Sequence, residues 1–291
     1  MNLLLAFLLF FPFFATERPE GNVVVNAGEV FTAATANGRF VASQRGKIWL
    51  DGRLYLDMSY AVVQDGERGL TGLAWTDTLY VLYVDRDQQM TLGRIADRVL
   101  TLVRQFGPAA DRHSTAALSA GPDLSLYIGI GENGDPLLYG RILRLSQFDS
   151  LSIFASGFRN PWGMRWQDGN LIVADVGEGR REEANLVVQG QHYGWPCFEG
   201  ELPYVYDPDR CLSLRHTLPI GQYDHGLGNA IINTVVVSGR LLAIDITGNV
   251  IDLASRQVVH RLPHPVTFAQ AVPDGFLIGG YGFVRFSRTL S

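Results

Sequence analysis

Residues 168–177 read DGNLIVADVG, a turn signal followed by a short apolar run, and this unit recurs along the chain. A short β-branched and apolar run bounded by Gly and Asp predicts a β-strand. No stretch after residue 25 shows a sustained 3.6-residue period, so the sequence predicts an all-β protein. The other copies of the unit are GRFVASQ (38–44), DTLYVLYVD (77–85), DLSLYIGIG (123–131), SGRLLAID (238–245) and DGFLIGG (274–280).

The spacing of these units predicts how the strands assemble. Successive units are 39, 47, 45, 70 and 36 residues apart when measured between Phe40, Leu79, Leu126, Leu171, Leu241 and Leu277. Four of the intervals lie near the ~40–50 residues of a four-stranded propeller blade. The long interval indicates an insertion near residues 191–225. We therefore expect one six-bladed β-propeller domain over residues 22–291, with a pair of β-sandwiches as the alternative.

Composition narrows the class of protein. The chain has 291 residues, of which 47% are hydrophobic and 18% are charged, with 32 glycines and a formal net charge of −5. These values exclude a disordered tail, a coiled coil and a basic nucleic-acid binder. Lys47 is the single lysine among 24 basic residues, so chemistry that needs two lysines is excluded as well.

The N-terminus and the two cysteines bear on the compartment. Leu3 to Ala15 form an apolar run of 13 residues, which is shorter than the ~20 residues that span a bilayer. The run predicts a secretory signal, hence export to the periplasm or outside the cell and no integral membrane span; an uncleaved anchor and a misassigned start are the alternatives. In an exported protein we expect Cys197 and Cys211 to pair as a disulfide, with two free buried thiols as the alternative.

Polar residues that directly follow the predicted inner strands are candidates for a site. In a propeller, ligands gather where the inner strands and the connections between blades converge on the channel. Residues in that position are Gln44, Glu132, Asp175 and Asp245.

Three longer motifs resemble the glucose/sorbosone dehydrogenase family. They are GFRNPWGMRW (157–166), LIVADVGEGRREEANLVVQGQHYGWPCFEG (171–200) and HSTAALSAGPDLSLYIGIGE (113–132). With shorter matches the resemblance covers roughly residues 35–287. It implies a six-bladed propeller that oxidises an aldose at its anomeric carbon with pyrroloquinoline quinone (PQQ) and calcium, and that passes the electrons to an external acceptor.

The resemblance also implies roles for individual residues. It makes His113 the catalytic base, a role that suits an imidazole because its pKa lies near neutrality. It places Gly177 and Glu178 at a bend whose main-chain oxygens hold calcium, which prefers oxygen ligands. The expected contacts of the cofactor and its pocket are Arg159, Asn160, Glu132 and Gln44.

Two departures from the family pattern leave other functions open. Thr247 or a neighbour stands where the family has a lysine, and the family's late arginines meet residues 265–275, which contain no basic residue. A tricarboxylic quinone bound by one arginine would leave charge unpaired. The main alternative is therefore a secreted, non-enzymatic propeller that binds a carbohydrate or a protein. A lactonase with calcium held by Asp175, Asp245 and Glu132 is a further alternative.

Overall fold

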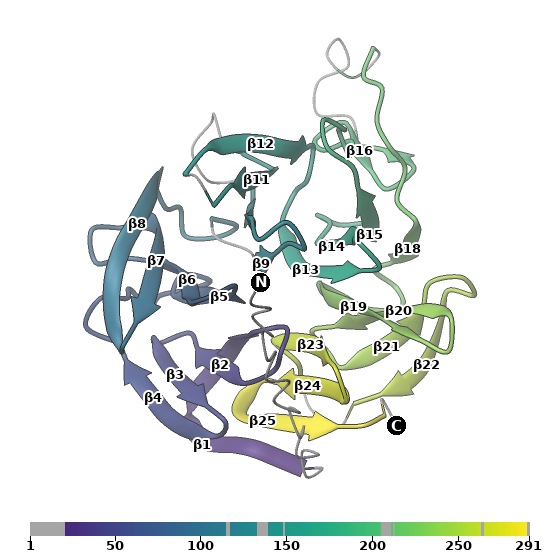
Figure 1. The fold of residues 1–291 in the computed structure, drawn as a ribbon. Coiled ribbons are helices and arrows are strands. Elements are labelled where there is room, and N and C mark those ends of the chain that lie inside the picture. The colour runs from purple at the N-terminus through teal and green to yellow at the C-terminus, as the bar shows by residue number, and fades with distance from the viewer. Residues whose placement is uncertain are drawn as a thin grey trace, which may run out of the picture.

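The computed structural model describes residues 21–114, 117–132, 139–147, 149–204, 211, 213–262 and 265–289. Its antiparallel strands form blades arranged radially around a central channel (Figure 1). This confirms the prediction of an all-β, six-bladed propeller. Among the described residues, no helix is long and apolar enough to span a membrane. The N-terminal run Leu3 to Ala15, with the predicted signal, lies outside the described residues.

Four blades are separate four-stranded sheets. Blade 2 contains β5 (Leu70–Trp75), β6 (Leu79–Val84), β7 (Gln89–Ala96) and β8 (Val99–Pro108). Blade 3 contains β9 (Leu118–Ala120), β10 (Leu126–Ile130), β11 (Arg141–Leu145) and β12 (Leu151–Ser156). Blade 4 contains β13 (Pro161–Gln167), β14 (Asn170–Asp175), β15 (Arg181–Val187) and β18 (Gly221–Asp224). Blade 5 contains β19 (Ile231–Val237), β20 (Arg240–Asp245), β21 (Asn249–Asp252) and β22 (Gln257–Arg261).

The first and last blades share one long strand, which closes the ring. The first half of β1 (Gly21–Ala34) pairs with the last strand of the chain, with Val24 opposite Val284. Its second half pairs with the next strand, with Ala34 opposite Val41. Blade 1 therefore continues from β1 through β2 (Phe40–Ser43), β3 (Lys47–Leu50) and β4 (Arg53–Asp57). Blade 6 is formed by β1 with β23 (Phe268–Val272), β24 (Gly275–Gly279) and β25 (Tyr281–Ser287).

The repeated sequence unit is the second strand of each blade, which corrects our assignment of it as the inner strand. The six units fall on β2, β6, β10, β14, β20 and β24. The channel is instead lined by the strands that precede them, β1, β5, β9, β13, β19 and β23. The second strands are buried on both faces between neighbouring blades, and this burial is why they carry the strongest apolar pattern.

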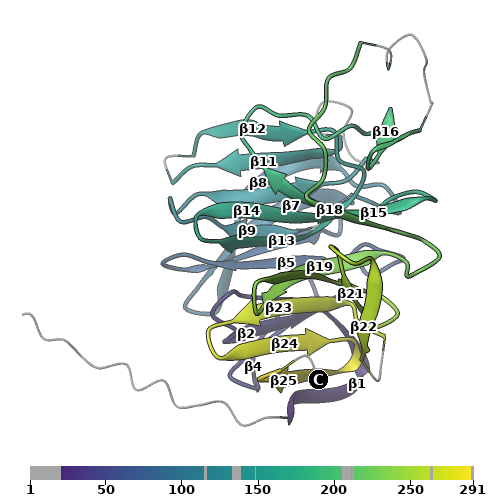
Figure 2. The ribbon, with the colours of Figure 1, turned by 90° about the vertical axis from the view of Figure 1, so that its right-hand side faces the viewer.

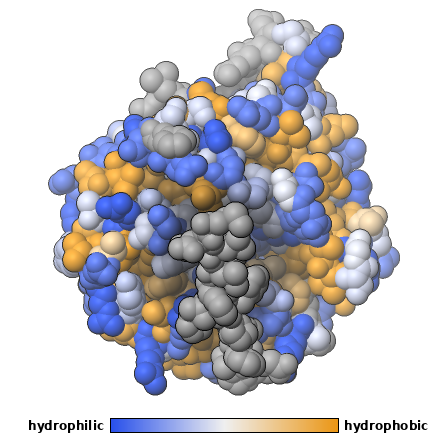
Figure 3. Space-filling view, in the orientation of Figure 1, coloured by the Kyte–Doolittle hydropathy of each residue, from blue (hydrophilic) through white to orange (hydrophobic). Residues whose placement is uncertain are grey.

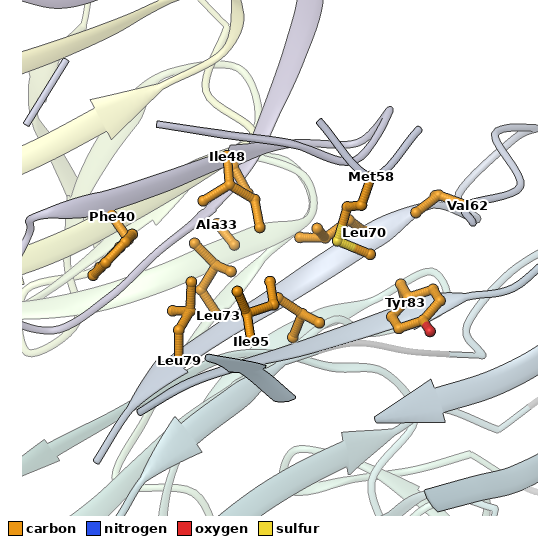
Figure 4. Packing of buried hydrophobic residues seen from close by; sticks show 12 residues of the cluster. Ala33, Phe40, Ile48, Met58, Val62, Leu70, Leu73, Leu79, Tyr83 and Ile95 are labelled. Carbon is orange, nitrogen blue, oxygen red and sulfur yellow. The ribbon is translucent and has the colours of Figure 1, made fainter. Parts of the chain in front are cut away.

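Apolar side chains between blades hold the ring together. Figure 4 shows one such interface, where Ile48 of blade 1 lies opposite Leu70 and Leu73 of blade 2. Ile48 and Leu70 are fully buried. Burying a side chain of this size stabilises a fold by ~1.5–3 kcal/mol, so each interface is a substantial part of the stability.

The long connection between β15 and β18 departs from the regular blade. Its first residues run beside β12 of blade 3, where Ser156 N donates to Gln191 O at 3.1 Å and Tyr193 N donates to Ser156 O at 2.8 Å. The segment then carries the short strands β16 (Phe198–Glu199) and β17 (Leu202–Pro203) and projects from one end of the ring (Figure 2). The predicted disulfide between Cys197 and Cys211 is confirmed. The fourth strand of blade 4, β18, lies inside the insertion that the sequence predicted near 191–225.

Candidate functional site

The candidate site lies at the end of the ring from which this connection projects. In an antiparallel blade, the turn after the second strand and the connection that leads into the first strand lie at the same end. His113 precedes β9 and Arg159 precedes β13, while Glu132 follows β10 and Glu178 follows β14. The topology therefore brings together residues from connections that are far apart in the sequence.

His113 and Glu132 form the centre of the cluster. Nδ1 of His113 lies 3.3 Å from Oε1 of Glu132. The other carboxylate oxygen, Oε2, accepts a hydrogen bond from Nε1 of Trp195 at 2.8 Å. Burial by itself would raise the pKa of Glu132, but the contact with His113 and the charge of Arg159 hold it below its ordinary value. Glu132 is therefore an ionised acceptor at neutral pH.

The backbone of His113 adopts an uncommon conformation. Its φ is +55°, a left-handed region that non-glycine residues seldom occupy. The residue is held there from two sides, because its N–H donates to Oε2 of Glu67 at 3.0 Å and its ring meets Glu132. Gly131 is needed for the close approach, since a Cβ at that position would overlap the carbonyl of His113. Such conformations cluster at functional sites.

Arg159 is in contact with carboxylates, carbonyls and an aromatic ring of this chain, and its buried Nε forms no hydrogen bond with the described residues. Its Nε lies 3.3 Å from Oε1 of Glu132, and its Nη1 donates to the carbonyl of Gly177 at 2.8 Å. Its Nη2 donates to the carboxylate of Glu178, and the guanidinium lies 5.7 Å from the ring centroid of Trp195. The guanidinium therefore already pairs with two carboxylates.

Asp175 anchors the backbone of Arg159 and Asn160. Its Oδ2 accepts the N–H of Arg159 at 2.9 Å and its Oδ1 accepts the N–H of Asn160 at 2.7 Å. Burial raises the pKa of Asp175 to about 7. The side-chain oxygen of Asn160 is buried and has no hydrogen-bond partner within the described part of the chain.

Glu67 belongs to the cluster, and our sequence analysis missed it. Besides accepting the N–H of His113, its Oε2 lies 3.9 Å from Nε2 of the same ring. It lies in the connection between β4 and β5, which is the same type of connection that carries His113 and Arg159. Its place in that connection could have identified Glu67 from the sequence, because residues that precede the first strand of a blade lie at this end of the ring.

Gln44 contacts the loop that carries Glu67. Its Nε2 donates to the carbonyls of Gly66 and Arg68, both at 2.8 Å. These carbonyls flank Glu67, so Gln44 braces the loop that brings Glu67 to His113. No hydrogen bond or ion pair joins Gln44 to His113 or Arg159 among the described residues.

One of the two predicted calcium ligands, the carbonyl of Gly177, accepts a hydrogen bond from Arg159. Arg159 also meets Glu178, through the side chain and not through the predicted main-chain oxygen. In the described ranges, no three His, Cys, Asp or Glu side chains are arranged to hold a metal. Asp245 accepts from Thr247 at 2.8 Å and from the N–H of Asn249 at 2.8 Å. The hydroxyl of Thr247 therefore forms its hydrogen bond within blade 5.

A cavity of about 490 Å³ adjoins the cluster. Glu132 and Trp195 belong both to the cluster and to the wall of this cavity. The wall continues with Arg141, Ser156, His192 and Pro196. Its volume lies within the ~300–1,000 Å³ of small-molecule sites.

The cluster carries an excess of carboxylates. The side chains of Glu67, Glu132 and Glu178 are 38%, 25% and 46% exposed. Arg159, whose side chain is 8% exposed, pairs with two of them, and a second arginine, Arg141, lines the adjoining cavity. The site therefore presents hydrogen-bond acceptors to an incoming ligand, and its charge disfavours an anionic one.

Comparisons with known proteins agree with this fold. The family model described as Glucose / Sorbosone dehydrogenase matches residues 31–210. Quinoprotein glucose dehydrogenase B of Acinetobacter calcoaceticus is 27% identical over 132 residues, which cover 32% of this chain and 28% of that protein. The matched region is thus less than a third of that relative's length.

Two solved structures are similar over almost the whole chain. The PQQ-bound aldose sugar dehydrogenase of Streptomyces coelicolor has a TM-score of 0.71 at 19% identity, covering 91% of this chain and 95% of that one. The apo-form of the soluble aldose sugar dehydrogenase of Escherichia coli has a TM-score of 0.65 at 16% identity, covering 91% and 97%. At these identities the likeness concerns the fold alone.

Proposed function

This chain belongs to the glucose/sorbosone dehydrogenase family, and we propose that it binds a neutral sugar at the His113–Glu132 cluster. The observation that carries the proposal is the pair of partly exposed carboxylates, Glu67 and Glu132, on the imidazole of His113. A third partly exposed carboxylate, Glu178, lies on the neighbouring Arg159. Sugar hydroxyls are donors as well as acceptors, and carboxylates are strong acceptors. A ligand with several hydroxyl groups and no negative charge therefore matches the site.

The contact with Glu132 sets the chemistry of His113. We assign the proton of the neutral ring to Nδ1, because Glu132 can only accept there. Nε2 then carries a lone pair and faces Glu67, whose Oε2 is 3.9 Å away. A sugar hydroxyl held there can donate to either group, and the imidazole can accept its proton.

A trianionic quinone does not fit the described residues. Each carboxylate of PQQ would need a cation or several donors to offset its desolvation. Arg159 already pairs with Glu132 and Glu178 and donates to two main-chain carbonyls, although its buried Nε forms no hydrogen bond with the described residues. Thr247 lies near the position of the family's lysine, and its hydroxyl donates a hydrogen bond to Asp245. The described residues therefore do not offer the quinone the cations that its three carboxylates need.

Quinone-dependent oxidation of an aldose is the second candidate function. Family membership and the pairing of His113 with Glu132 favour it. In this second function, His113 would accept the proton of the anomeric hydroxyl. Oxidation further requires a hydride acceptor, and the charge around Arg159 opposes the anionic one that the family uses.

Calorimetric titration with D-glucose, D-galactose and D-gluconate tests the sugar site. We expect a neutral sugar to bind at least ten-fold more tightly than gluconate, and Glu132→Gln to weaken it ten-fold or more. Glu201→Gln, an exposed glutamate in the projecting segment, is the control and should bind as the parent does. Equal affinity for gluconate, or no effect of Glu132→Gln, would contradict the proposal.

Titration with PQQ and calcium, followed by an aldose and a dye acceptor, separates the two functions. If the protein only binds sugar, the parent should reduce no more dye than His113→Ala does. Dye reduction that requires both PQQ and His113 would show that the protein is a dehydrogenase and would overturn the sugar-binding proposal.

We also propose that the protein is exported. The disulfide between Cys197 and Cys211 supports this, because such bonds persist mainly in oxidising compartments. Fractionation of the native cells is the test, and recovery of the protein with both thiols alkylated from the cytoplasm would contradict it.

A further inference from the structure

A large cavity lies between blades 5 and 6, toward the outer side of the ring. One wall belongs to the end of β22 in blade 5, and the other belongs to β25 and the start of β1, which adjoin β22 in Figure 1. We call it the rim cavity. Its volume of about 580 Å³ is within the ~300–1,000 Å³ of small-molecule sites. Hydrophobic and hydrophilic residues are intermixed over the surface of the ring (Figure 3), so a site is recognised here by its volume and by the residues that face it.

The strand register places the side chain of Arg285 on the face of blade 6 that is turned to blade 5. Ile278 of β24 marks that face, because it packs among apolar side chains of blade 5. Ile278 lies directly opposite Arg285 in the pairing of β24 with β25, and residues opposite each other in an antiparallel pair point to the same side. The sequence neighbours Val284 and Phe286 pack instead toward blade 1. Arg285 therefore faces blade 5, and it is exposed in the wall of the rim cavity.

The facing wall of the rim cavity comes from blade 5. His260 lies opposite Val250 in the pairing of β22 with β21. Because Val250 packs toward blade 6, the imidazole of His260 is turned to the same side. Leu262 and Val266 continue this wall and belong to the apolar cluster that also contains Ile278. The cavity therefore has an apolar lining beside the guanidinium of blade 6.

The charge of Arg285 is not offset at the rim cavity. None of the described wall residues is Asp or Glu, and within the described ranges Arg285 forms no ion pair. Arg159 of the sugar site differs, because it is buried and pairs with two carboxylates. A guanidinium presents parallel N–H donors that match the two oxygens of one carboxylate. Arg285 by itself can therefore bind the carboxylate of a ligand.

We propose that the rim cavity binds an amphipathic monocarboxylate, with the carboxylate on Arg285 and the hydrocarbon chain against Ile278 and Val266. A single guanidinium offsets a single negative charge, and the apolar lining removes the chain from water. The rim cavity and the cavity beside the His113–Glu132 cluster have no wall residue in common. This proposal is therefore independent of the proposed sugar site.

Octanoate is the probe, and octanamide, acetate and inorganic phosphate are the comparisons. By calorimetry at low salt, we expect octanoate to bind at least ten-fold more tightly than any of the three. From butyrate to octanoate, each added CH₂ group should raise the affinity roughly two- to four-fold. Equal binding of octanamide would mean that the lining alone binds the chain, and equal binding of acetate or phosphate would mean a non-specific anion site. Each of these results would overturn the proposal, as would no binding of octanoate.

Three variants test the role of Arg285. Arg285→Met should weaken octanoate binding at least ten-fold and leave octanamide binding unchanged, a difference that a loss of structure would not produce. Arg53→Met removes an exposed arginine from β4 of blade 1 and should bind octanoate as the parent does.

Asn22→Asp keeps Arg285 and supplies it with a partner. Asn22 is exposed and lies opposite Arg285 in the pairing of β1 with β25, so an aspartate there should compete with the ligand for the guanidinium. We expect octanoate binding to weaken at least three-fold and octanamide binding to stay the same. If Arg285→Met fails to fold, Asn22→Asp decides. An unchanged octanoate affinity in either folded variant would refute the assignment of Arg285.

Discussion

Oε1 of Glu132 lies 3.3 Å from Nδ1 of His113, although the two residues are 19 positions apart. His113 precedes the first strand of blade 3 and Glu132 follows its second strand. The antiparallel pairing of β9 with β10 therefore places both residues at the same end of the blade. The pair depends on one blade, whereas Arg159 and Glu67 reach it from the connections on either side.

Glu132→Gln should lower the free energy of unfolding by ~1–2 kcal/mol at pH 7, because a charged acceptor is lost. The pKa of Glu132 is lowered in the folded protein from an ordinary value of 4.5. Its stabilisation is therefore present above that value and is lost as the pH falls below it. Urea unfolding at pH 7 and at about pH 3.5 is the measurement. A difference from the parent that does not shrink in acid would contradict this reading, and Glu201→Gln is the control.

Stability should fall as the pH rises from about 5 to about 8. Burial raises the pKa of Asp175 to about 7, and burial together with the charge of Asp175 raises that of Glu183 to about 8. The folded protein then holds protons that the unfolded chain has released, so unfolding becomes easier as these groups ionise. The hydrogen bond to Glu182 raises the pKa of His225 and acts in the same direction.

Glu183→Gln should flatten this dependence, since an amide does not titrate. Unfolding free energies at half-unit steps between pH 5 and pH 8.5 are the measurement, and the parent should lose more than ~1 kcal/mol across the range. Glu201→Gln should keep the slope of the parent. An identical slope in Glu183→Gln would show that other groups are responsible.

Removing the disulfide by Cys197→Ala with Cys211→Ala should cost about 3 kcal/mol, the loop-entropy estimate for a separation of 14 residues. The bond closes a loop that begins two residues after Trp195, which donates to Glu132, so sugar affinity should also fall. Reductant should reproduce both effects in the parent and have none in the double variant. A parent that is insensitive to reductant under unfolding conditions would contradict the prediction.

Gly177→Ala should destabilise the protein by about 1–3 kcal/mol through overpacking. A Cβ at Gly177 would overlap the carbonyl oxygen of Arg181 and meet Oε1 of Glu199, whereas one at Gly179 meets no atom within 4 Å. Gly179→Ala is therefore a matched control and should stay within ~0.5 kcal/mol of the parent. Thermal unfolding of the two variants measures the difference, and equal effects would refute the packing argument.

The sequence alone determined the fold class, the six repeats and the pairing of Cys197 with Cys211. These properties depend on local signals, namely apolar runs, turn residues and their spacing, which are readable without knowing the neighbours of any residue. The motifs also identified His113, Glu132 and Arg159, and the structure places them in contact.

Only the tertiary structure decided which groups these residues meet. Glu67 reaches His113 because the ring brings two connections to one end. Arg159 pairs with two carboxylates because the turns after β10 and β14 bring Glu132 and Glu178 to it. Arg165 lies in the same motif as Arg159, yet it points to a neutral partner in the neighbouring blade. Whether an arginine is paired depends on side chains from separate blades, and no local pattern in the sequence records that arrangement.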